Sequence, residues 1–157
     1  MVLVDQSTKA LAIATLSTTT RVPLLGDALG LQLAFNPGAA FSLGAGSTGI
    51  ITVITFAAVL FLTRAALRTT SPSWATGIGL IWGAAIGNLL DRLFAPPGFG
   101  IGHVTDFLAY GELFIGNIAD AALSVGFGVL GWELCRARRG VQAPQSRLAP
   151  AEREAPE

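Results

Sequence analysis

Three long apolar stretches dominate the hydrophobic pattern of this chain. They cover residues 50–67, 74–94 and 114–135. Each is long enough to cross a hydrocarbon layer of about 30 Å as a helix that rises about 1.5 Å per residue. Residues 1–16 form a weaker fourth candidate, because this stretch is short and contains Asp5 and Lys9. The pattern predicts an all-α polytopic membrane protein with four transmembrane helices.

Two segments depart from this helical pattern. Apolar and polar positions alternate over residues 31–36, as in a half-buried strand, and a Pro37-Gly38 turn follows at once. This segment predicts a small β element at the membrane surface. Residues 140–157 are rich in Pro, Ala, Arg and Glu, so we expect a disordered tail after a membrane-embedded domain of residues 1–139.

Composition supports a lipid environment and excludes other classes of protein. The 157 residues are 52% hydrophobic and 13% charged, whereas about a quarter of the residues in a soluble domain are charged. The net charge is zero, so no basic surface for nucleic acid is expected. Cys135 is the only cysteine, which excludes an intramolecular disulfide and a site with several thiolate ligands.

Arginines indicate how the chain is oriented. They lie between the second and third apolar stretches and just after the last one: Arg64, Arg68, Arg136, Arg138 and Arg139. The positive-inside rule places both regions, and with them the C-terminus, in the cytoplasm. Residues 17–49, with the β element, and residues 95–113 are then expected on the outer face.

Carboxylates and amides cluster near the outer ends of the predicted spans, where burial in hydrocarbon makes them costly. Asn88 and Asp91 are three residues apart and share a helix face, and Asn117 and Asp120 repeat this spacing. Asp106 lies in the connection before the last span and can fold back onto the same region. The sequence predicts that these side chains meet.

A pair of aspartates at this depth suits peptide hydrolysis. One carboxylate can take a proton from water while the other, protonated, polarises the scissile carbonyl. The alternative is a small transporter or proton-conducting protein, because buried Asp and Asn also move ions. Transport sites lie near the bilayer midplane, whereas these residues lie toward one face, which favours the peptidase.

Five motifs, in order along the chain, resemble those of the lipoprotein signal peptidase (signal peptidase II) family. They are Asp5-Gln-Ser-Thr-Lys9, Asn36-Pro-Gly-Ala-Ala-Phe41, Gly83-Ala-Ala-Ile-Gly-Asn88-Leu-Leu-Asp91-Arg92, Val104-Thr-Asp106-Phe107 and Asn117-Ile-Ala-Asp120. The resemblance implies an aspartyl endopeptidase of the bacterial inner membrane with its active site near the outer face. It also implies a substrate: a prolipoprotein embedded in membrane lipid, cleaved before its diacylglyceryl-modified cysteine. The resemblance implies no cofactor and no metal. We expect the enzyme to be monomeric.

The resemblance also assigns roles to individual residues. Asp106 and Asp120 correspond to the catalytic pair. Other family positions line the substrate groove or support the pair, and they fall on Asn36, Asn88, Arg92 and Asn117. Asp91 is adjacent to Arg92, so substrate contact and a simple interfacial charge pair both remain open for these two residues.

Asp5 and Lys9 are spaced as a mutually neutralising helical pair, for which a structural role is expected. The chain departs from the family pattern in having only four residues before Asp5, so we expect the functional first helix to begin further upstream. Gly116 and Ala121 stand where the family commonly has Phe and Ser.

Overall fold

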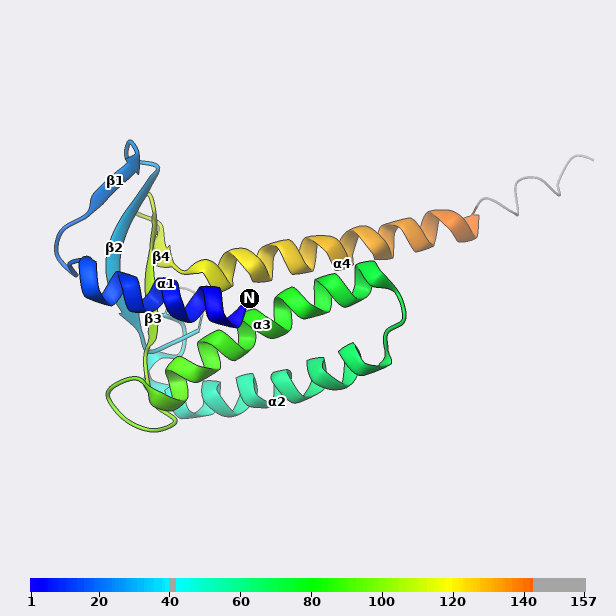
Figure 1. The fold of residues 1–157 in the computed structure, drawn as a ribbon, viewed down its shortest axis with the longest axis horizontal. Coiled ribbons are helices and arrows are strands. Elements are labelled where there is room, and N and C mark those ends of the chain that lie inside the picture. The colour runs from blue at the N-terminus through cyan, green and yellow to red at the C-terminus, as the bar shows by residue number, and fades with distance from the viewer. Residues whose placement is uncertain (40–41, 143–157) are drawn as a thin grey trace, which may run out of the picture.

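The computed structural model of the chain describes residues 1–39 and 42–142. Three long helices run side by side, and a β-sheet lies across one end of them (Figure 1). The helices are α2 (Thr48–Arg68), α3 (Pro72–Phe94) and α4 (Ile118–Gln142). A short helix, α1 (Val2–Thr15), packs against α3 beside the sheet, and a 3-10 helix, η2 (Ala45–Ser47), precedes α2.

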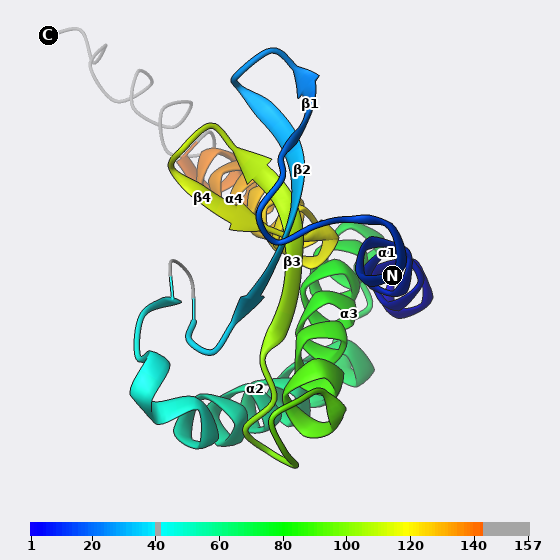
Figure 2. The ribbon, with the colours of Figure 1, turned by 90° about the vertical axis from the view of Figure 1, so that its left-hand side faces the viewer.

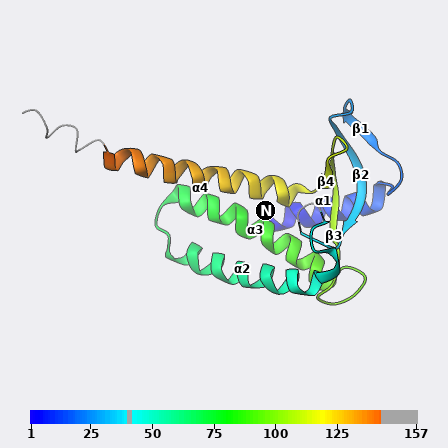
Figure 3. The same ribbon diagram turned by 180° about the vertical axis from the view of Figure 1, so that it is seen from behind.

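Three of the four predicted spans are confirmed as helices that could cross a membrane. By length and composition, the described residues contain three such helices: Ala45–Arg68, Pro72–Phe94 and Ile118–Arg139. The first predicted span is instead α1, a helix of 14 residues that does not qualify. The last helix extends beyond the other two at the end away from the sheet (Figure 3).

The sheet is larger than the small element predicted. It has four antiparallel strands in the order β1-β2-β3-β4, and Figure 2 shows them across the end of the helical bundle. The strands are β1 (Val22–Leu25), β2 (Leu29–Asn36), β3 (Val104–Tyr110) and β4 (Phe114–Gly116). The predicted strand over residues 31–36 is confirmed as part of β2.

The connection that contains Asp106 includes a strand that the sequence did not predict. Residues 104–110 form β3, and most of this strand is buried on both faces, which removes the alternation that would have revealed it. The predicted start of the last span at residue 114 is wrong. Residues 114–116 form β4, so the last helix begins at Ile118 and not at the apolar Phe114. At the other end of the chain α4 continues to Gln142, past the predicted boundary at residue 139, and the predicted tail lies from residue 143 onward outside the described residues.

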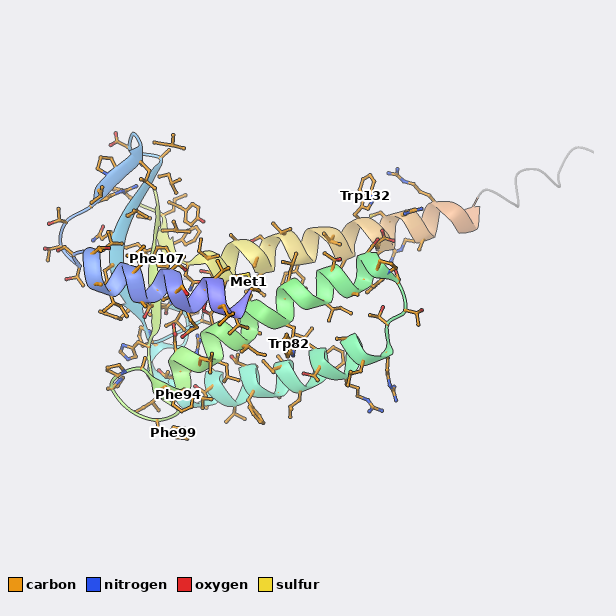
Figure 4. The ribbon with its side chains drawn as sticks, in the orientation of Figure 1. Met1, Trp82, Phe94, Phe99, Phe107 and Trp132 are labelled. Atoms are coloured by element: carbon orange, nitrogen blue, oxygen red, sulfur yellow. The ribbon has the colours of Figure 1, made fainter. Side chains whose placement is uncertain are left out.

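Few large side chains are buried between the helices. One cluster contains Ala12, Leu33 and Phe107 and joins α1 to the sheet, where Figure 4 labels Phe107. The other consists of alanines of α3 and α4. Large apolar side chains of α2, such as Ile50 and Phe61, point outward and are exposed. Such a distribution suits helices whose outer faces contact lipid.

Small residues bring the helices close together. Gly77 of α3 and Gly126 of α4 face each other, and a Cβ atom on Gly126 would lie 2.6 Å from Ile81 Cγ1 and 2.9 Å from the Gly77 carbonyl oxygen. Between α2 and α3 the contact includes a polar link, because Trp82 Nε1 donates a hydrogen bond of 2.8 Å to Thr63 Oγ1 (Figure 4 labels Trp82). The absence of a side chain at these two glycines therefore lets α3 and α4 approach closely.

We predict that Gly126→Ala destabilises the purified protein by about 1–3 kcal/mol, because the added methyl group overpacks the contact with α3. The matched control is Gly128→Ala in the same helix, where a Cβ atom would meet nothing within 4 Å. The control should be neutral or slightly stabilising. Denaturant titration in detergent measures both, and equal stabilities of the two variants would contradict this account of the packing.

Candidate active site

The polar residues singled out from the sequence meet where the sheet joins the helices. Asp106 is on the central strand β3, and Asn36 is at the end of β2, opposite Val104 of β3. Asn117 and Asp120 lie at the start of α4, and α3 contributes Asn88 near its end. Four elements thus converge on one site.

The Asn-x-x-Asp spacing at α4 is explained by a reciprocal helix cap. Asn117 Oδ1 accepts a hydrogen bond of 3.2 Å from the backbone N–H of Asp120, and Asp120 Oδ2 accepts one of 2.9 Å from the backbone N–H of Asn117. This is the geometry of a capping box, which satisfies two N–H groups that a helix start leaves without partners. The cap fixes the Asp120 side chain at the first turn of the helix.

The same asparagine also holds the other aspartate. Asn117 Nδ2 donates a hydrogen bond of 2.6 Å to Asp106 Oδ1, and Asn36 Nδ2 donates one of 3.2 Å to Asp106 Oδ2. Asn117 is only 1% exposed and Asp106 3%. Asn117 therefore contacts both aspartates: its side chain bonds the Asp106 carboxyl and the Asp120 backbone, and its own backbone N–H bonds the Asp120 carboxyl. The prediction that these side chains meet is confirmed.

Burial raises the pKa of the Asp106 carboxyl to about 6. The hydrogen bond from Asn117 opposes this rise, the negative charge of Asp120 adds to it, and the hydrogen bond from Asn36 opposes it. A carboxyl group with such a pKa can bind or release a proton near neutral pH, as a general acid or base must.

Glycine at position 116 allows the close placement of Asp120. A Cβ atom on Gly116 would lie 2.7 Å from Asp120 Oδ2, the oxygen that accepts the cap hydrogen bond. The absence of a side chain here leaves room for the capped carboxylate.

Behind the pair of aspartates lies a buried ion cluster that involves α1. Lys9 Nζ lies 2.9 Å from Asp5 Oδ2, 2.9 Å from Asp91 Oδ2 and 2.8 Å from Asn88 Oδ1. The lysine is 2% exposed and Asp5 is fully buried. The predicted Asp5–Lys9 pair is confirmed, and its second carboxylate partner on α3 was not foreseen.

Asp91 and Arg92 do not form the charge pair considered from the sequence. Asp91 Oδ2 accepts a hydrogen bond of 3.0 Å from the backbone N–H of Thr105, which ties α3 to β3 just before Asp106. Arg92 Nη2 donates one of 2.7 Å to the Gly38 carbonyl oxygen and so holds the turn after β2. Both residues are buried and secure neighbouring segments of the site.

Gln6 is the site residue that sequence reasoning missed. Its Nε2 atom lies within hydrogen-bond distance of Asp5 Oδ2, of the Gly87 carbonyl oxygen and of Asp91 Oδ1, at 3.2, 3.1 and 3.1 Å. The residue falls inside the first motif, but nothing in its spacing indicates partners more than 80 positions away.

A cavity of about 480 Å³ opens beside the two aspartates. Its polar wall contains Asn36, Asn88, Arg92, Asp106, Asn117 and Asp120. Its apolar wall includes Ile51 of α2 and Leu123 and Phe127 of α4. A mostly apolar cavity with a few convergent polar groups is typical of a ligand site. Within the described residues, no group of three or more His, Cys, Asp or Glu is placed to hold a metal ion.

We predict that Lys9→Met lowers the free energy of unfolding by about 3–5 kcal/mol, because it leaves Asp5 and Asp91 buried without their cation. Arg136→Met is the control, since this arginine is 74% exposed and its contact with Glu133 is 3.8 Å long. That change should cost less than about 1 kcal/mol. Similar losses in the two variants, measured by denaturant titration in detergent, would show that the buried cluster does not stabilise the fold.

Comparison with known proteins agrees with the resemblance in the motifs. Lipoprotein signal peptidases of Leifsonia xyli, Rhodococcus jostii and Mycobacterium avium are 46%, 39% and 40% identical over 128, 144 and 149 residues. These matches cover 81%, 88% and 91% of the chain. They span 59%, 73% and 82% of the three relatives, so the chain covers less than two thirds of the first.

Solved structures share the fold. One bacterial membrane enzyme, determined by the in meso method at 2.3 Å resolution, superposes with a TM-score of 0.78 and 24% identity over 99% of the chain and 89% of its own. A second, determined at 1.9 Å, has a TM-score of 0.72 and 24% identity, over 85% and 86% of the two chains. Residues 1–136 match the family described as signal peptidase (SPase) II, and the chain therefore belongs to the signal peptidase II family.

Proposed function

We propose that the chain is a membrane aspartyl endopeptidase in which Asp106 and Asp120 are the catalytic pair. The substrate is a prolipoprotein, cut just before its diacylglyceryl-modified cysteine. The observation that carries this proposal is the single Asn117 side chain bonded to both aspartates at the wall of the cavity. Membership of a peptidase family favours hydrolysis over the alternative of a small transporter or proton-conducting protein.

The two carboxyl groups divide the chemistry of hydrolysis between them. The ionised one takes a proton from a water molecule, whose oxygen attacks the scissile carbonyl carbon. The protonated one gives its proton to the carbonyl oxygen, which yields a neutral tetrahedral diol. When the diol collapses, one of its hydroxyl groups gives a proton to the ionised carboxylate, the protonated carboxyl gives its proton to the leaving amine, and the C–N bond breaks. The pair therefore again holds one proton.

The surroundings of the pair favour this shared proton. Burial and the proximity of two negative charges oppose double ionisation, and the titration then belongs to the pair as a unit. Asn117 and Asn36 donate to Asp106 and hold its carboxyl plane in place. A geometry held by such hydrogen bonds needs little rearrangement during the reaction.

The cavity suits an apolar substrate that arrives through the membrane. Part of its apolar lining comes from α2 and α4, which are both long enough to cross a bilayer. A signal peptide and a diacylglyceryl group can therefore reach Asp106 and Asp120 without leaving lipid. The aspartates lie at the sheet end of the helices, where water can enter from the aqueous phase.

We place the sheet end on the outer face of a bacterial inner membrane and the C-terminus in the cytoplasm. Arg68 at the end of α2 and Arg136 near the end of α4 lie at the opposite end of the bundle from the sheet. Positive charge is retained on the cytoplasmic side. In this arrangement α1 is the fourth membrane helix, with Asp5 and Lys9 turned toward α3 and away from lipid.

We predict that Asp106→Asn and Asp120→Asn each lower cleavage by several orders of magnitude while the protein stays folded, because an amide cannot exchange the required proton. The double variant should be hardly worse than either single one, since the pair acts as a unit. Asp27→Asn in the exposed β1–β2 turn is the control and should retain full activity. The assay is release of the signal peptide from a diacylglyceryl prolipoprotein. Near-normal turnover in either single variant would contradict the proposal that Asp106 and Asp120 are the catalytic pair.

Removal of the Asn36 amide should change the pH profile in a defined direction. Its hydrogen bond favours the ionised form of Asp106, so Asn36→Ala raises the pKa of that carboxyl further. Activity requires one proton on the pair and falls when rising pH removes it. The alkaline limb of kcat/KM is therefore expected to move to higher pH.

Gln32→Ala, on the same strand, is the control for this pH profile. The Gln32 side chain donates to the Thr18 carbonyl oxygen and not to Asp106. Its profile should match that of the unmodified protein. A limb that moves to lower pH in Asn36→Ala, or that does not move, would contradict the proposed protonation of the pair.

A further inference from the structure

A second cavity lies on the sheet side of Asp106. It has a volume of about 300 Å³ and is lined by Ala34 and Phe35 of β2, by Ser42 and by Leu113 in the β3–β4 turn. It shares four lining residues with the larger cavity: Asn36, Asp106, Phe114 and Ile115. The two cavities therefore meet at a catalytic aspartate.

The two cavities differ in which elements form them. The larger one reaches along the membrane helices, with Ile51, Thr55, Leu123 and Phe127 in its wall. The smaller one draws its lining from the strands of the sheet, from the turn between β3 and β4, and from Ser42 in the connection after β2. Ala34 is paired directly with Asp106 across β2 and β3, so the two residues share a face of the sheet. A chain that passes Asp106 can thus run from the helices onto this face.

Three parts of the proposed substrate diverge from the scissile bond. The signal peptide and the diacylglyceryl group are apolar, and transfer of either into water is costly. The mature polypeptide after the cysteine is the only part that must leave the membrane for the aqueous phase. The helical cavity fits the two apolar parts, which leaves the cavity over the sheet for the third.

We propose that the cavity lined by Ala34, Phe35, Ser42 and Leu113 is a subsite for the first residues of the mature chain after the lipidated cysteine. This inference rests on the proposed function. Phe35 is 48% exposed and Leu113 82%, so two apolar side chains at this cavity are available to contact the substrate backbone and its side chains. Binding there holds the scissile carbonyl against Asp106 from the product side, as binding of remote substrate parts does in other enzymes.

The test uses substrates of increasing length. A synthetic signal peptide with a diacylglyceryl cysteine ends either at that cysteine, as an amide, or after one to four further residues. With the unmodified protein, kcat/KM should rise about tenfold as the first two residues are added and then level off, because only these gain contacts in the cavity. Cleavage is followed by mass spectrometry.

Two variants link the length effect to the cavity. Phe35→Ala and Leu113→Ala should reduce the gain to about threefold or less while they leave cleavage of the shortest substrate unchanged. Leu24→Ala in β1, 50% exposed and outside the cavity, is the control and should keep the full gain. A gain that is independent of Phe35 and Leu113 overturns the proposal, as does equal loss of activity on every length.

The same series separates this proposal from the proposed function. Cleavage of all lengths at one rate by the unmodified protein, with none by Asp106→Asn, refutes the subsite and supports the catalytic pair. Equal cleavage by Asp106→Asn, or no cleavage of any substrate by the unmodified protein, refutes the proposed function and the subsite with it.

Discussion

The hydrogen bonds of Asn117 are the interaction on which the site depends. This buried amide accepts from the backbone of Asp120 and donates to Asp106, while its own backbone N–H is bonded to the Asp120 carboxylate. The start of α4 and the geometry of the two aspartates are therefore one structural feature. A buried polar group must find partners or incur a large desolvation penalty. The hydrogen bonds that satisfy Asn117 also keep the two carboxyl groups together.

The ion cluster around Lys9 performs a related task one layer further from the cavity. Two carboxylates and the Asn88 amide oxygen surround its ammonium group, and Asp91 in turn accepts a hydrogen bond from Thr105 beside Asp106. Helix α1 is thereby joined to α3 and to β3. Burial of these charges is tolerable only because each has an oppositely charged or hydrogen-bonded partner. The short first helix thus contributes to placing the strand that carries Asp106.

The position of the site between sheet and helices reconciles two opposing demands. Peptide hydrolysis needs water and ionisable groups, whereas a lipid-modified substrate with an apolar signal peptide favours hydrocarbon. Glycines such as Gly77 and Gly126 let the helices approach without a large apolar core. Large apolar side chains lie instead on the outer faces of the helices. The polar groups gather at the end where the sheet covers them. The proposed chemistry then occurs at the boundary between the two environments.

The amino-acid sequence alone determined the long helices α2 and α3, part of β2, and the family to which the motifs belong. These features depend on local pattern: runs of apolar residues, alternation, and the spacing of Asn and Asp by three positions. It also indicated that Asp106 could approach Asp120, because both were expected at the same end of the helices.

Only the tertiary structure decided that Asp106 lies on a strand and that the last helix begins after Asn117. Strand β3 is buried on both faces, so it shows no alternation, and its partner β2 lies about 70 positions away in the chain. The contacts of Lys9 with Asp91 and of Arg92 with Gly38 span similar distances in sequence. Such pairings arise from the packing of whole elements, and no local property of the sequence specifies them.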